Sequence, residues 1–146
     1  RTPHNDSEIQ GSITGVFTDT SVEDLTRGVL EGVAFALRDC FDALTAPDAK
    51  MDQLIAIGGG TKSRYWLRLI STVLNVPLQL PKSGEFGAAL GAARLGMAAS
   101  TRAPMDSIIT PPSICETIDP DPTLLETFGE AHRAFAAAYP AINRIQ

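Results

Sequence analysis

The sequence predicts an α/β fold in which short buried strands alternate with helices. Residues 53–57 and 76–80 are short apolar runs, and the first of them has no polar face, which is typical of a buried strand. Between them, residues 63–74 show the apolar spacing of a helix with one buried side. A strand–helix–strand unit implies two parallel strands and a right-handed crossover.

Before this unit, the sequence predicts polar loop, one short strand over 13–17 and one long helix over 21–45. Thr20 is followed three residues later by Glu23, and this pair predicts a capping box at the start of the helix. The small residues Gly28, Gly32 and Ala36 lie on one side of that helix, where another backbone can approach closely.

After the unit, a helix is expected over 85–99, and its many Gly and Ala residues predict close packing against the sheet or another helix. Four prolines between 100 and 120 predict an extended connector there. The terminal helix is expected over 121–140, ending at Pro140.

The composition is that of one ordinary soluble domain with enough apolar residues for a core of its own. The chain has 146 residues, of which 44% are hydrophobic and 20% charged. The net charge of -5, without a Lys/Arg run, argues against nucleic acid or an anionic membrane as a partner. No apolar run reaches the roughly 18–20 residues that span a bilayer. Cys40 and Cys115 indicate free thiols in a reducing compartment, so we expect a cytoplasmic location.

The start of the chain is polar and begins at Arg1, without a signal peptide, so we expect a piece of a larger protein. His4 and His132 have no partner at metal-ligand spacing, and we expect no metal site in this chain. Trp66 could stack on a base, but its helical spacing favours core packing.

The segment between strand 53–57 and helix 63–74 holds the clearest signal for ligand binding. It contains Gly58, Gly59 and Gly60, followed by Thr61, Lys62 and Ser63. Glycines let a ligand lie against bare backbone, and a helix N-terminus offers free amides to phosphate or hydroxyl groups. A tight turn without any ligand explains the same spacing equally well.

Two familiar phosphate motifs do not fit this segment. A Walker A loop requires Gly where Thr61 stands. A Rossmann fingerprint requires Gly where Ser63 stands, and Lys82 rather than an acidic residue follows the second strand. A Rossmann-like dinucleotide-binding domain nevertheless remains an alternative, as does a non-catalytic module that uses its small-residue faces for packing or dimerisation.

Several pieces of sequence, taken in order, carry a family resemblance. They are Arg1–Asp6, Glu31–Phe35, Ile57–Ser63, Trp66, Val76-Pro77 and Gly87–Ala93. Together they resemble the C-terminal domain of the FGGY family of carbohydrate kinases, most closely its xylulokinase branch. The resemblance implies that residues 1–146 form part of an actin-like (ribonuclease H-like) ATPase domain, a mixed sheet flanked by helices on the nucleotide side of a two-domain kinase.

The same resemblance implies which residues meet the nucleotide. In the family, a Gly-Gly-x-x-x-[Ser/Asn] segment contacts ATP or ADP. Carried over, Gly58, Gly59 and Ser63 would touch the nucleotide, with Gly60 and Thr61 beside them. Arg68, Ser71, Thr72 and Asn75 depart from the family pattern, at positions that we expect to orient or end the helix.

The implied reaction is phosphoryl transfer from ATP to a hydroxyl of a pentulose, with D-xylulose as the expected sugar. The resemblance places the catalytic Asp upstream of Arg1, and the Mg²⁺ ligands and most sugar contacts in an N-terminal domain. No catalytic or metal-binding residue is therefore expected within this chain, and the chain alone is expected to be inactive. A homodimer is a further expected partner.

Overall fold

The structure is a computed structural model and describes residue 4 and residues 6–45, 51–82 and 87–144. Most of the opening motif at 1–6 and the first two residues of the helix predicted over 85–99 lie outside the described residues. The elements are α1 (Val22–Thr45), β1 (Leu54–Ile55), the 3-10 turn η1 (Gly59–Lys62), α2 (Arg64–Leu74), β2 (Leu78–Pro81), α3 (Gly87–Thr101), α4 (Met105–Ile108), β3 (Ile114–Ile118) and α5 (Leu125–Ile142).

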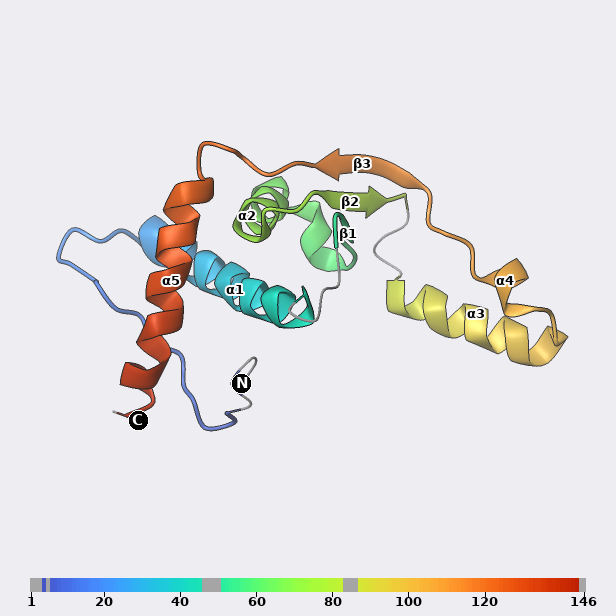
Figure 1. Cartoon of the computed structure of the whole chain (residues 1–146), viewed down its shortest axis with the longest axis horizontal. Helices are drawn as coiled ribbons and strands as arrows, with labels where there is room; N and C mark the ends of the chain where they lie inside the picture. The colour runs from blue at the N-terminus through green and yellow to red at the C-terminus, as the bar shows by residue number, and fades with distance from the viewer. Residues whose placement is uncertain (1–3, 5, 46–50, 83–86, 145–146) are drawn as a thin grey trace.

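The sheet has three strands in the order β1-β2-β3 and is mixed. β1 and β2 run parallel, with Leu54 opposite Leu78, and α2 connects them. β3 pairs antiparallel with the other side of β2, where Leu78 lies opposite Ile118. The structure confirms the α/β class, the parallel strand–helix–strand unit and the mixed sheet (Figure 1).

The prediction of a strand over 13–17 is wrong. The structure has no strand there, and Ile13, Val16 and Phe17 are exposed. A strand is stable only beside a partner, and the described part of the chain provides none at this place. Conversely, the segment predicted as an extended connector contains α4 and β3, because β2 supplies a partner for residues 114–118.

The terminal helix continues beyond its predicted end. Pro140 lies inside α5, which runs to Ile142, so Pro140 does not end the helix. A proline lacks one backbone donor. The helical bond from the Asn143 N–H to the Tyr139 carbonyl, 2.9 Å, still forms beyond it.

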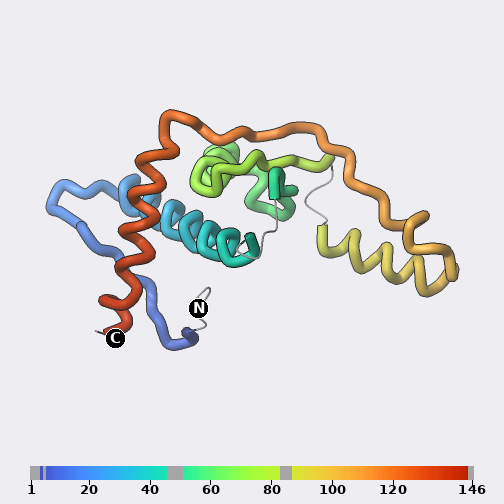
Figure 2. Tube along the Cα trace, viewed as in Figure 1, coloured from blue at the N-terminus to red at the C-terminus, as the bar shows by residue number. Residues whose placement is uncertain are grey.

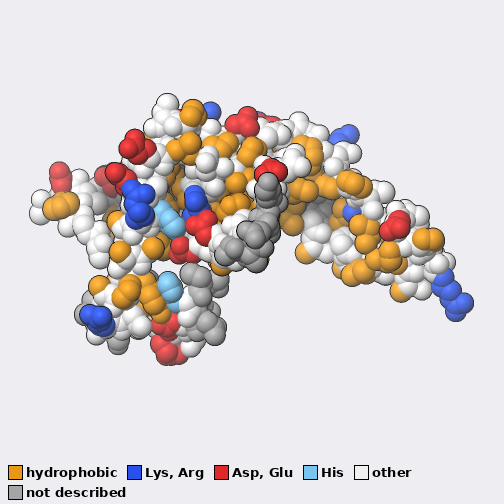
Figure 3. All heavy atoms as spheres, viewed as in Figure 1, with side chains coloured by type: hydrophobic (Ala, Val, Ile, Leu, Met, Phe, Trp, Pro, Cys, Tyr) orange, Lys and Arg blue, Asp and Glu red, His pale blue; other side chains and the backbone are white. Residues whose placement is uncertain are grey.

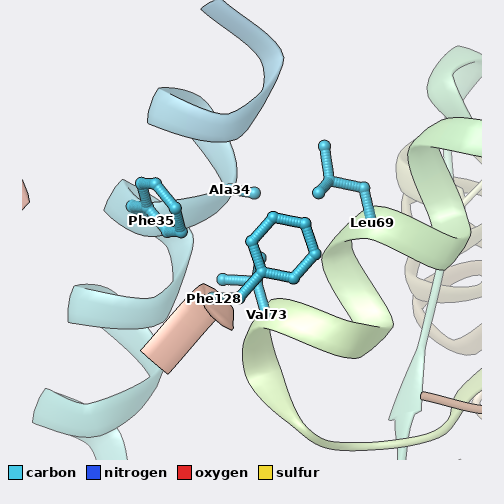
Figure 4. Packing of buried hydrophobic residues seen from close by; sticks show 5 residues of the cluster. All are labelled: Ala34, Phe35, Leu69, Val73 and Phe128. Carbon is cyan, nitrogen blue, oxygen red and sulfur yellow. The ribbon is translucent and has the colours of Figure 1, made fainter. Parts of the chain in front are cut away.

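The core lies where α1, α2 and α5 meet. Its buried members are Ala34, Phe35, Leu69, Val73 and Phe128, with Trp66 packed at the margin as expected. Figure 4 shows the Phe128 ring of α5 between side chains of α1 and α2. The rings of Phe35 and Phe128 meet edge to face at 6.3 Å between centroids. Burial of each Phe, Leu or Val side chain in this core contributes about 1.5–3 kcal/mol relative to exposure.

Hydrogen bonds hold helix α2 in place at both ends and along one side. Ser63 caps its start by accepting a hydrogen bond from the Trp66 N–H, and Asn75 ends it in the left-handed region at φ 53°. The buried Ser71 hydroxyl lies 2.9 Å from the Val76 carbonyl oxygen and 3.0 Å from that of Ile118 in β3. Thr72 accepts a hydrogen bond from the Asp121 N–H at 3.0 Å. These contacts agree with the expectation that Ser71, Thr72 and Asn75, which differ from the family pattern, orient or end the helix.

The cap of α1 lies one residue later than predicted. Asp24 Oδ2 accepts from the Ser21 N–H at 3.0 Å and from the Ser21 hydroxyl at 2.6 Å, and Ser21 Oγ accepts from the Asp24 N–H. Thr20 Oγ1 instead accepts from the Phe17 N–H at 2.8 Å. The reciprocal cap therefore joins Ser21 and Asp24, not Thr20 and Glu23.

The small-residue helices pack less tightly than predicted. None of the residues of α3 is buried, and Figure 2 shows α3 and α4 extending away from the other helices. On α1, a Cβ on Gly32 would come within 3.9 Å of the Phe135 ring of α5, whereas a Cβ on Gly28 would meet nothing within 4 Å. Gly32 thus meets a side chain at ordinary contact distance, and the close backbone approach predicted there is not found among the described residues at either glycine.

Candidate functional site

The segment from Gly58 to Ser63 connects the carboxyl end of β1 to the start of α2. Gly58 has φ 95° and ψ 178°, a conformation that glycine adopts without strain. Residues 59–62 then form the single turn η1. In open α/β sheets, ligands bind outside the carboxyl ends of the strands. The segment therefore lies where this class of fold binds its ligands.

Thr61 and Ser63 hold the loop in shape. The Thr61 hydroxyl donates to the Gly58 carbonyl oxygen at 2.7 Å, and the Thr61 N–H donates to the same oxygen at 3.1 Å. The Ser63 N–H donates to the Gly60 carbonyl oxygen at 3.2 Å, and Ser63 Oγ accepts from the Trp66 N–H at 3.3 Å. Because Ser63 Oγ acts as an acceptor in the cap, its hydroxyl hydrogen is the group that it can offer to a ligand.

The glycines leave open space in front of the loop. Gly59 and Gly60 are exposed, and a Cβ on Gly58 or Gly59 would meet no atom within 4 Å. The first amides of a helical turn have no acceptor within that turn. The N–H groups at Gly59 and Gly60 are therefore well placed for an anionic or hydroxyl-rich ligand.

Two further residues border the loop, and the sequence reasoning assigned neither of them to the site. A Cβ on Gly60 would lie 3.4 Å from Cδ1 and Nε1 of Trp66, so the indole lies directly beside the loop. Gly87, the first residue of α3, is so close to Ile57 that a Cβ there would stand 2.5 Å from Ile57 Cδ1. The only signal in the sequence was a small residue at 87, since the contact joins segments on either side of β2.

The charge around the loop suits an anion. Lys62 is exposed in η1, and the segment 57–63 contains no Asp or Glu. Arg64, at the start of α2, forms an ion pair with Glu116 of β3 and so ties this end of the helix to the sheet. The loop offers amides, hydroxyls and one ammonium group, which bind a ligand but provide no carboxylate, imidazole or thiol for catalysis.

In the part of the chain that the structure describes, no cluster of three or more His, Cys, Asp or Glu could hold a metal ion. The ligands of the expected Mg²⁺ were predicted to lie outside this chain. His132 is half-buried and lies 2.7 Å from Asp39, joining α5 to α1. His4 stacks on Tyr139 with 3.5 Å between ring centroids. Both histidines thus have structural contacts with α1 or α5.

A cavity beside the N-terminal segment does not include the loop. A cavity of about 460 Å³ lies between residues 9–14, α1 and α5, and contains no residue of 58–63. Among the described helices, none combines the length and apolar character that crossing a bilayer requires. The structure does bring Gly58, Gly59, Gly60, Thr61 and Ser63 into one exposed loop, and their contact with a nucleotide remains a prediction.

Known proteins are similar to this chain over nearly its whole length. The sequence model of the FGGY family of carbohydrate kinases, C-terminal domain, matches residues 1–100. The chain is 38% identical to the xylulose kinase of Escherichia coli (strain K12) over 100 residues, which are 68% of this chain and 21% of that protein. It is 31% identical to the xylulose kinase of Klebsiella pneumoniae over 144 residues, which are 98% of this chain and 30% of that protein.

A solved structure is similar along the full length. The crystal structure of a xylulose kinase from Brucella ovis matches with a TM-score of 0.88 and 47% identity, covering 100% of this chain and 30% of that one. This chain therefore spans about a fifth to about a third of the length of these relatives. The likeness includes β3 and α5, which lie beyond the residues matched by the family.

Proposed function

The chain belongs to the FGGY family of carbohydrate kinases, as part of the family's C-terminal domain, and from this membership we propose that it forms the nucleotide-binding side of an ATP-dependent sugar kinase. The sugar that we propose is a pentulose, D-xylulose, because the E. coli and K. pneumoniae relatives are both xylulose kinases.

The open glycine loop between β1 and α2 is the feature that best supports a nucleotide site. Gly58 and Gly59 let the nucleotide lie against bare backbone, since no neighbouring atom fills the space in front of them. The Ser63 hydroxyl donates to the nucleotide while its oxygen caps α2. Gly60 and Thr61 keep the loop in shape from beside the ligand.

The reaction that this site serves is phosphoryl transfer, in which positioning and charge stabilisation supply most of the catalysis. The loop amides, the N-terminus of α2 and Lys62 hold negative charge on the nucleotide. The base, the Mg²⁺ ligands and most sugar contacts belong to parts of a kinase outside this chain. The chain of 146 residues alone therefore binds ATP or ADP but does not phosphorylate a sugar.

Trp66 provides a direct reporter for nucleotide binding. It is the only tryptophan of the chain, and its indole lies beside Gly60. We expect ATP and ADP to change its fluorescence in a saturable way and NADH not to do so. Saturable binding of NADH without binding of ATP would instead support a Rossmann-like domain, and binding of neither would support a packing module.

A loop variant with a matched control locates the site. Gly59→Val adds a side chain where no atom lies within 4 Å, so the fold accommodates it while the nucleotide does not. Gly11→Val adds the same side chain to another exposed loop glycine with equally open surroundings. We expect the Kd for ATP to rise at least about tenfold (about 1.4 kcal/mol) in Gly59→Val alone. Equal affinity in both variants would place the nucleotide elsewhere.

A further inference from the structure

A pocket of about 340 Å³ lies where the end of α2 meets α1 and α5. Its polar lining comes from three separate parts of the sequence: Arg38 of α1, Asn75 at the end of α2, and His132 and Arg133 of α5. Figure 3 shows basic side chains beside a histidine at the surface where α5 crosses α1 in Figure 1. The packing of three helices therefore creates this pocket, which no local segment could form.

Arg38 enters the pocket with its orientation already fixed. Its Nε donates to Asp42 Oδ1 at 2.7 Å, and its Nη1 donates to the Val73 carbonyl oxygen at 2.8 Å. A guanidinium group carries five N–H groups. The two on Nη2 have no partner among the residues that the structure describes. Arg38 therefore offers a donor pair whose position costs little further ordering.

Arg133 lies at the rim of the same pocket and is free to turn toward a ligand. Its side chain is exposed, and its Nη2 lies 4.0 Å from Glu130 Oε1, which is beyond hydrogen-bond distance. An exposed pair at this separation contributes little to stability. Gly129 lines the pocket beside it, where a Cβ would come 3.9 Å from Arg133 Nη1. The missing side chain at Gly129 thus leaves space next to the guanidinium group.

The carboxylates that contact these residues do not line the pocket. Asp39 Oδ1 lies 2.7 Å from His132 Nε2, and Asp39 borders the cavity beside residues 9–14 instead. Asp42 pairs with Arg38 and is likewise absent from the lining. Among the described residues that line the pocket, there is no Asp or Glu, although the whole chain has a net charge of -5. The lining is therefore rich in donors and suits an anion.

The rest of the lining is largely apolar. Val73, Leu125 and Phe128 form this part, and Val73 and Phe128 belong to the core. The volume of about 340 Å³ lies within the range of small-molecule sites, about 300–1,000 Å³. The pocket thus has room for an anionic group together with a small organic part.

We propose that this pocket binds a phosphate group, either free or as the monoester of a small alcohol. Arg38 and Arg133 hold the phosphate oxygens from α1 and α5, and the Asn75 side-chain amide donates from the end of α2. Guanidinium groups match the geometry of phosphate and form charge-assisted hydrogen bonds with it. The site goes beyond the proposed function and is independent of it, since no residue of 58–63 lines the pocket.

The first test is a titration of the chain with three probes: inorganic phosphate, glycerol 3-phosphate and glycerol. Binding is followed by the NMR signal of the Gly129 amide, which lies in the pocket lining. We expect saturable shifts with both phosphate compounds and none with glycerol. Tighter binding of glycerol 3-phosphate would identify a monoester as the ligand, and tighter binding of inorganic phosphate would identify the free anion.

Variants on two elements then locate the phosphate. Arg133→Gln should raise the Kd at least about tenfold, because a charge-assisted bond is lost. Arg102→Gln removes the same charge from an exposed residue outside the pocket and should change the Kd less than about twofold. Asn75→Gly keeps the left-handed backbone at φ 53° but removes the amide, and should raise the Kd about threefold.

Three results would overturn the proposal. The first is the absence of any saturable shift with either phosphate compound, and the second is an equal Kd in Arg133→Gln and Arg102→Gln. The third is weaker phosphate binding in Gly59→Val but not in Arg133→Gln, which would place the phosphate at the glycine loop. Arg133→Gln should leave the ATP-dependent fluorescence of Trp66 unchanged, so failure at this pocket and failure at the loop are separate results.

Discussion

Gly87, at the start of α3, lies so close to Ile57 that a Cβ on it would fall 2.5 Å from Ile57 Cδ1 and 3.3 Å from Ile57 Cβ. This contact connects α3 to the chain that enters the glycine loop. Gly87→Ala must displace the Ile57 side chain, and we expect it to lower the free energy of unfolding by about 1–3 kcal/mol.

Gly91, one turn later in α3, is the matched control for that substitution. A Cβ there would meet nothing within 4 Å. Replacing an interior helical glycine by alanine gains about 1 kcal/mol when no clash opposes it. Urea unfolding of the two variants should therefore give changes of opposite sign. If both substitutions stabilised the protein, the Ile57 side chain would be able to move aside at no cost in free energy.

Ser71 joins α2 to β3 through a fully buried hydroxyl. Its Oγ lies near the carbonyl oxygens of Val76 and Ile118. Ser71→Ala leaves those acceptors without this donor, and we expect a loss of about 1–3 kcal/mol in urea unfolding. Ser107→Ala removes an exposed hydroxyl that donates to the nearby Pro104 carbonyl, and should change stability by less than about 0.5 kcal/mol.

The cap on α1 is tested by substituting the two candidate pairs separately. Ser21→Ala removes the reciprocal hydrogen bonds with Asp24 and is expected to reduce stability by about 1 kcal/mol. Glu23→Gln tests the pair that the spacing alone predicted, and only a few tenths of a kcal/mol should be lost. Thermal unfolding at neutral pH distinguishes the two, and a larger effect at Glu23 would restore the original assignment.

Asp6 and Tyr139 anchor the N-terminal segment to α5, since the Tyr139 hydroxyl donates to Asp6 Oδ2 at 3.0 Å. Hydrogen bonds from the Glu8 N–H and from this hydroxyl lower the pKa of Asp6, whereas desolvation and Asp6 raise the pKa of Tyr139. The contribution of Asp6 is present above the ordinary carboxyl pKa and is lost as pH falls through the lowered value. That of Tyr139 is present below about pH 10 and is lost as pH rises through the raised value.

This contact can be followed at Asp6 by NMR titration. In Tyr139→Phe, one of the two main hydrogen bonds to the carboxylate is lost, so the pKa of Asp6 should move up toward its ordinary value. The bond from Glu8 remains, so the return should be partial. An unchanged titration would show that the tyrosine does not contact Asp6 in solution.

The capping of α1 illustrates what a sequence pattern leaves undecided. Thr20–Glu23 and Ser21–Asp24 are overlapping pairs with the same spacing, and either could start the helix. The path of the preceding chain decides between them, because Thr20 Oγ1 accepts a hydrogen bond from Phe17. Such a choice depends on the backbone before the helix, which no local pattern describes.

The sequence by itself determined the parallel strand–helix–strand unit and the glycine loop at its turn, because both depend on residues close together in the chain. Only the tertiary structure decided that 114–118 forms β3, that α3 stays uncovered and that Gly87 meets Ile57. Strand pairing and close packing derive their stability from partners that are distant in sequence, so their presence cannot be read from a local pattern.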